Sequence, residues 1–113
     1  MTAYTQNAAT TLLSNATSLG PGTPSGYLED PLGTVQAYST FTVELVYTDT
    51  TISGTVNIEG SLDGGTTWNT IGEVHTTPGL YTITGPGVIQ IRGNLVSIAG
   101  TGAAVTVIAI GIS

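Results

Sequence analysis

Residues 56–71 constrain the fold more than any other part of the chain, because they encode a complete β-hairpin. They read Val-Asn-Ile-Glu-Gly-Ser-Leu-Asp-Gly-Gly-Thr-Thr-Trp-Asn-Thr-Ile. Apolar residues at alternate positions before Asp63 indicate a strand with one buried face. Asp63, Gly64 and Gly65 then provide a tight turn, since glycine adopts positive φ without strain, and Trp68 opens the return strand.

The turn also matches the spacing Ser-x-Asp-x-Gly-x-x-Trp of the Asp-box, a hairpin motif that recurs in sialidase-type propellers. The motif occurs once here, whereas a propeller needs repeated blades and a longer chain. We therefore predict a structural role for Asp63, Gly64, Gly65 and Trp68. The carboxylate accepts hydrogen bonds from turn amides, and the tryptophan packs beside the turn.

Further strand signals follow from residue 34 at the short, regular spacing that is typical of sandwiches and barrels. We expect strands at 41–47, 56–62, 68–74, 80–84, 88–92 and 105–112, with Gly85-Pro-Gly as a turn before the fifth. No convincing helical periodicity is present. The sequence predicts one all-β domain, an antiparallel β-sandwich of jelly-roll-like or immunoglobulin-like type. The expected core residues are Phe41, Val43, Leu45, Val56, Ile58, Leu62, Trp68, Ile83, Ile89, Ile91, Val105 and Val107.

Residues 1–33 have a different character and predict an N-terminal arm ahead of a sandwich domain of residues 34–113. Proline and glycine exclude regular structure from much of this segment, although it has room for one strand. Leu12, Leu13 and Leu28 are scattered among polar residues, and they are candidates for an interface. Two interpretations stay open, an extended segment that grips a neighbouring subunit and a flexible terminus.

Charged residues make up only 7% of the chain, against about 25% in ordinary soluble domains. Arg92 is the only Lys or Arg residue, and the net charge is −6. Nucleic acid and anionic membranes are held mainly by Lys and Arg, so we expect neither as a partner. Lysines on exposed edge strands usually prevent these strands from pairing with another chain, and this chain has no lysine. We therefore expect its edges to be covered in an assembly, most simply a homo-oligomer.

The last strand is apolar on both faces. Val105, Val107 and Ala109 share one face, and the opposite face carries Ile108, Ile110 and Ile112. The strand is therefore either buried on both sides or half-covered by a partner. We take the three isoleucines as interface candidates, together with Arg92, which can pair with an acid within the domain or across a subunit boundary.

Two carboxylates provide the sharpest catalytic hypothesis. If strands 41–47 and 56–62 were neighbours, Glu44 would fall opposite Glu59, and paired carboxylates about 5 Å apart serve retaining glycosidases. Like charges directly opposite each other are unfavourable, so two solvated glutamates are the simpler reading. His75 is the single histidine and there is no cysteine. We therefore predict no enzyme, no metal and no cofactor.

Aromatic residues leave a second function open. Trp68 and several tyrosines could form a platform that stacks on sugars, although packing in the core and the turn is the more ordinary role. The residues concerned are Tyr27, Tyr38, Tyr47, Tyr81 and Trp68.

Four segments together resemble small β-sandwich virion proteins of tailed bacteriophages. They are Thr-Phe-Thr-Val-Glu-Leu at 40–45, the hairpin of residues 54–68, Ile-Gln-Ile-Arg-Gly-Asn-Leu at 89–95 and Gly-Ala-Ala-Val-Thr-Val-Ile at 102–108. The resemblance covers roughly residues 34–112. It implies a structural role, either as a capsid decoration protein seated between major capsid subunits or as a module of the tail or fibre, and it favours a homotrimer.

The first residues contain no basic or long apolar stretch, which favours synthesis in the host cytoplasm before assembly into a virion. We expect the acidic outer surface to keep the particle soluble. The alternatives are a carbohydrate-binding tail module and, more distantly, a glycosidase using Glu44 and Glu59.

Overall fold

The computed structural model describes residues 9–48, 53–75, 77–100 and 102–112, and all regular structure in these ranges is β. The strands are β1 (Thr10–Ala16), β2 (Gly20–Pro21), β3 (Tyr38–Tyr47), β4 (Ser53–Ser61), β5 (Asn69–His75), β6 (Gly79–Val88), β7 (Gln90–Ala99) and β8 (Val105–Ile112). The described part of the chain contains no helical segment with the length and apolarity of a membrane span.

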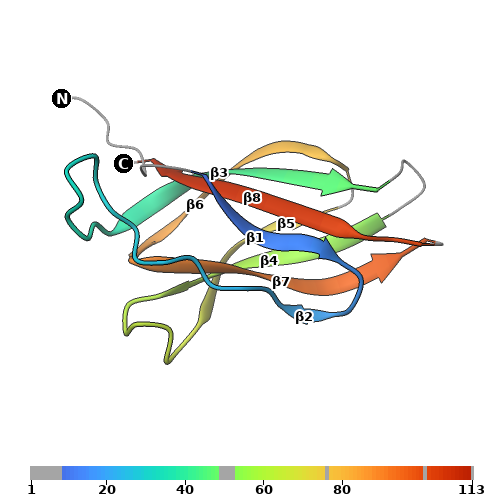
Figure 1. The fold of residues 1–113 in the computed structure, drawn as a ribbon, viewed down its shortest axis with the longest axis horizontal. Coiled ribbons are helices and arrows are strands. Elements are labelled where there is room, and N and C mark those ends of the chain that lie inside the picture. The colour runs from blue at the N-terminus through green and yellow to red at the C-terminus, as the bar shows by residue number, and fades with distance from the viewer. Residues whose placement is uncertain (1–8, 49–52, 76, 101, 113) are drawn as a thin grey trace.

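The strands form two antiparallel sheets of four strands each (Figure 1). Sheet A has the order β1-β8-β3-β6, and sheet B has the order β2-β7-β4-β5. This arrangement confirms the predicted antiparallel β-sandwich. Strands that follow one another along the chain mostly lie in different sheets, and β4 with β5 is the one consecutive pair that shares a ladder. That pair is the hairpin that the sequence predicts.

The core lies between the inner faces of the two sheets. Nine of the twelve expected core residues are buried, from Phe41 in β3 to Val107 in β8. Three expectations were wrong: Leu62 is 66% exposed, because it lies beyond the end of β4, and Trp68 and Ile89 are only half-buried. Several further side chains are buried that were not among the expected core residues, namely Leu12, Leu13, Leu28, Tyr38, Val74, Val88 and Leu95.

Described residues of the expected arm are instead built into the sandwich. β1 pairs with β8 in sheet A, and β2 pairs with β7 in sheet B. After β2, three backbone amides extend this pairing at 2.7 to 2.8 Å. Those of Gly22 and Ser25 donate to carbonyl oxygens of β7, and that of Leu28 donates to the Ile89 carbonyl just before β7. Leu12, Leu13 and Leu28 have exposures of 1%, 4% and 0%. These leucines pack inside their own chain, which corrects their assignment as interface residues.

The Gly85-Pro-Gly segment is a bulge inside β6, not a turn between strands. Val88 pairs with Tyr38 and Thr84 pairs with Thr40, so three residues of β6 lie opposite one residue of β3. β6 is at the edge of sheet A, where a proline removes no hydrogen bond from a ladder. The strand that follows is also longer than expected, because β7 continues through Gly93 to Ala99.

Candidate functional site

The outer face of sheet A is the first candidate for a functional surface. On β8, Val105, Val107 and Ala109 point inward and are at most 1% exposed. Ile108, Ile110 and Ile112 occupy the alternate, outward positions and are only partly covered. The two apolar faces predicted for this strand are therefore present, one in the core and one on the outside of the sheet.

Neighbouring strands extend this outer face without adding much charge. Ile108, Ile110 and Ile112 lie opposite Glu44, Thr42 and Thr40 of β3. On the other side of β3, Leu80 lies opposite Glu44 and is 70% exposed. A shallow hollow of about 170 Å³ opens among these side chains. Glu44 is the single charged residue in the four strands of sheet A, and its neighbours on this face at Thr42, Leu80, Ile108 and Ile110 are threonine or aliphatic.

The outer face of sheet B is polar and carries the chain's only arginine. Arg92 Nε lies 2.6 Å from Glu59 Oε1, and Asn94 Nδ2 donates to Glu59 Oε2 at 3.2 Å. The Arg92 guanidinium carbon lies 4.6 Å from the centre of the Trp68 ring, within the range of a cation–π contact. Arg92 thus has two partners in its own chain, in agreement with the intramolecular alternative.

Glu44 and Glu59 do not form a pair. Glu44 lies in sheet A between Leu80 and Ile108, whereas Glu59 lies in sheet B between Thr70 and Arg92. The hypothesis of a carboxylate dyad assumed that β3 and β4 are neighbours, and they belong to different sheets. The geometry proposed for a glycosidase is therefore wrong.

The tyrosines and Trp68 do not assemble one platform. Tyr38 and Tyr47 are core residues whose hydroxyls donate to the carbonyl oxygens of Glu29 at 2.5 Å and Gly54 at 3.1 Å. Tyr27 is 52% exposed. One ring face of Trp68 is covered by Arg92, as described above.

The turn of the β4–β5 hairpin has the hydrogen bonds expected of an Asp-box. The Ser61 hydroxyl donates to Asp63 Oδ1 at 2.8 Å and accepts from the Gly65 amide at 3.0 Å. The Thr67 amide donates to the same Asp63 oxygen at 2.8 Å, and Trp68 Nε1 donates to the Gly65 carbonyl at 3.0 Å. Gly64 and Gly65 have φ values of 73° and 91°, as the sequence suggests.

These donors hold Asp63 in its ionised form. The Thr67 amide and then the Ser61 hydroxyl lower the pKa of Asp63 from 3.8 to about 2. Because the pKa is lower in the folded chain, the stabilisation that comes from the ionised Asp63 carboxylate is present above its ordinary pKa and is lost as the pH falls through about 2. We expect a ¹³C NMR titration of the Asp63 carboxyl to have its midpoint near 2, and Ser61→Ala to move that midpoint upward. A wild-type midpoint at the ordinary value of 3.8 would contradict this account.

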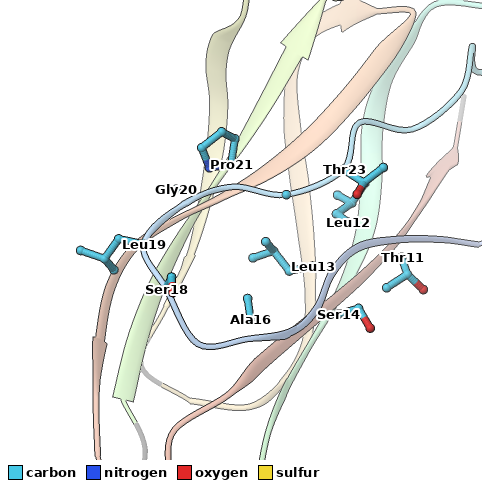
Figure 2. A pocket seen from close by; sticks show the side chains of 11 residues that line it. Thr11, Leu12, Leu13, Ser14, Ala16, Ser18, Leu19, Gly20, Pro21 and Thr23 are labelled. Carbon is cyan, nitrogen blue, oxygen red and sulfur yellow. The ribbon is translucent and has the colours of Figure 1, made fainter.

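A further hollow lies within the loop that joins β1 to β2. It measures about 350 Å³ and is lined entirely by residues between Thr11 and Thr23 (Figure 2). Leu13 lies inside the loop, whereas Leu19 points away from it and is 61% exposed. An added Cβ on Gly22 would lie 2.0 Å from the Leu12 carbonyl oxygen, so β1 and the residue that follows β2 are in contact. None of the lining side chains is charged.

Together these features define a two-sheet antiparallel β-sandwich with one aliphatic outer face and one polar outer face. No family model matches the chain, and no curated protein matches its sequence. In structure the chain is similar to the SPBc2 prophage-derived protein YomS, with a TM-score of 0.60 and 16% sequence identity. The similarity covers 100% of this chain and 96% of that chain. At this identity the likeness establishes a shared fold.

Proposed function

We propose that this protein is a structural protein of a bacteriophage virion, and specifically a capsid decoration protein that self-associates and docks on the major capsid protein. The outer face of sheet A carries this proposal. Its three outward isoleucines and Leu80 are accompanied by threonines and by one charged residue. An apolar sheet face of this kind gains about 25 cal/mol for each Å² that a partner covers.

The charge distribution agrees with such a role. The chain has a net charge of −6, but the strands of sheet A contribute only Glu44 to it. Two or three copies can therefore bring these faces together with little charge repulsion. The remaining acids stay available to keep an assembled particle soluble. A trimer is the oligomer that the sequence resemblance favours.

The fold also supports the proposal. The strand orders β1-β8-β3-β6 and β2-β7-β4-β5 support the interpretation of this sandwich as an eight-stranded jelly roll, an arrangement found in viral capsid and lectin domains. The similar protein YomS is described as prophage-derived.

A carbohydrate-binding module of a tail or fibre is the second candidate. It is favoured by the exposed Tyr27 and by the Trp68–Arg92 pair on the polar outer face of sheet B. Sugar-binding sites commonly combine an aromatic ring with a few fixed polar groups. This candidate predicts glycan binding that Trp68→Ala abolishes.

Electron microscopy with a gold-labelled antibody tests the proposal. Particles are purified by density gradient from a lysate in which the gene is expressed, and the antibody is raised against the full-length protein. We expect the protein to co-purify with the particles and the label to lie on their heads. Label confined to tails or fibres would favour the carbohydrate-binding candidate. Absence of the protein from purified particles would contradict a virion role altogether.

A further inference from the structure

A cleft opens between the Asp-box turn and β6, where two edge strands on the same side of the sandwich, β5 and β6, each contain a bulge. In β5 the extra residue is Ile71, because Ile58 pairs with Gly72 and Glu59 pairs with Thr70. The bulge of β6 spans residues 85–87. The two strands touch at this level, since an added Cβ on Gly85 would lie 2.9 Å from the Ile71 carbonyl oxygen. Bulges commonly occur next to functional sites, where they redirect side chains.

The cleft has a volume of about 420 Å³ and a mixed lining. Its apolar part comes from Leu62, Ile71, Pro86 and Val88. Its polar part comes from Asp63 and from the threonine and asparagine side chains between the turn and the start of β5. The floor is closely packed, because an added Cβ on Gly60 would lie 2.5 Å from Val88 Cγ1.

Leu62 is the unusual member of this lining. It is 66% exposed, although it follows Ser61, which is only 3% exposed. The Ser61 hydroxyl donates to the Asp63 carboxylate and accepts from the Gly65 amide, which fixes the backbone on either side of Leu62. A large aliphatic side chain therefore lies at the rim of the cleft, on a backbone that the turn fixes, and it is not part of the core. A concave site with an apolar lining and a few polar groups is the usual form of a binding site.

The charges of the chain argue against a second copy of the same protein as the partner that fills this cleft. Asp63 is an exposed carboxylate in the cleft, and a cation beside it would complement it. The chain has no lysine, and its single arginine is engaged with Glu59 and Trp68. A complementary cation must therefore come from a different protein.

We propose that this cleft receives a segment of an unlike protein in which an arginine or lysine stands next to an aliphatic side chain. The aliphatic group packs against Leu62, Ile71 and Pro86, and the cation lies beside Asp63. This inference rests on the proposed virion role and adds the chemistry of a second partner to it. The cleft is formed by the hairpin and the β6 bulge, whereas the self-association face is centred on β8.

An NMR titration with n-butylguanidinium, which joins a cation to a short aliphatic chain, tests this proposal on the full-length protein. We expect millimolar binding that shifts backbone amides between Leu62 and Ile71 and at Val88, with no such effect from n-butyrate. Asp63→Asn keeps an acceptor oxygen in the turn and should weaken binding about threefold, as expected for loss of an exposed ion pair. Leu62→Ser should also weaken binding, and Leu19→Ser, at another exposed leucine, should not.

Several results would overturn the proposal. The first is that n-butyrate binds as well as n-butylguanidinium. The second is that Asp63→Asn and Leu62→Ser both bind n-butylguanidinium like the wild type. The third is that no saturable shift occurs at the amides between Leu62 and Ile71 and at Val88. Shifts of the same amides by N-acetylglucosamine without any by n-butylguanidinium would assign the cleft to a sugar instead. The Ile108→Thr/Ile110→Thr variant should bind n-butylguanidinium like the wild type, so that failure of the cleft and failure of the self-association face give different results.

Discussion

Leu28→Ala should lower the free energy of unfolding by about 3 kcal/mol, because it removes a completely buried side chain and leaves a cavity. Leu28 is 0% exposed although it lies in a segment without regular strands. Its amide donates to the Ile89 carbonyl at 2.8 Å, and its carbonyl accepts from the Gln36 amide at 2.8 Å. The side chain is thus fixed over the core by backbone bonds on both sides. Urea unfolding followed by circular dichroism measures this loss.

Leu32→Ala is the matched control, since Leu32 lies four residues further along and is 87% exposed. Its cost should stay within about 0.5 kcal/mol. If Leu28→Ala instead left stability unchanged and altered only the oligomeric state, Leu28 would belong to an interface and the burial described above would be wrong. For the same reason, deletion of residues 1–33 should unfold the protein, because it removes β1 and three core leucines.

The hairpin was predictable because all of its information is local. Ser61, Asp63, Gly65 and Trp68 interact within the turn itself, so their spacing specifies the structure. The outward isoleucines of β8 were predictable for the same reason, since alternation along one strand determines which side chains share a face.

The strand neighbours were not predictable from local patterns. Consecutive strands in this fold mostly belong to different sheets, so the assumption that β3 pairs with β4 placed Glu44 beside Glu59 incorrectly. The true partner of Glu59 is Arg92, 33 residues away, and only the order of the strands brings them together. The sequence showed that Arg92 points outward, but not which acid it meets.

Leu12 and Leu13 were not predicted as core residues because buried and exposed residues do not alternate along β1. Leu12 and Leu13 are adjacent and both buried, since the pairing with β8 shifts register between Thr11 and Leu13. A bulge of this kind breaks the period of two on which strand recognition depends. Gly85-Pro-Gly was predicted to be a turn and is a bulge in β6. Glycine and proline occur both in turns and in bulges of edge strands, so these residues alone do not distinguish the two.

We expect the proposed oligomer to become a monomer when Ile108→Thr is combined with Ile110→Thr. Both side chains lie on the outer face of sheet A, and threonine keeps the β-branched shape while it reduces the apolar area that a partner covers. The inner residues Val107 and Ala109 are unchanged, so the circular dichroism spectrum should remain that of the wild type. Val96→Thr is the matched control, because Val96 is an exposed residue of sheet B.

Light scattering of the purified full-length protein, in line with size-exclusion chromatography, tests this self-association most directly. We expect a wild-type mass that is a multiple of 11.4 kDa, with three copies favoured, and the same mass for Val96→Thr. The Ile108→Thr/Ile110→Thr variant should have the mass of a single chain. A wild-type protein that stays at 11.4 kDa at high concentration, or a double variant that keeps the wild-type mass, would contradict the role given to the outer face of sheet A.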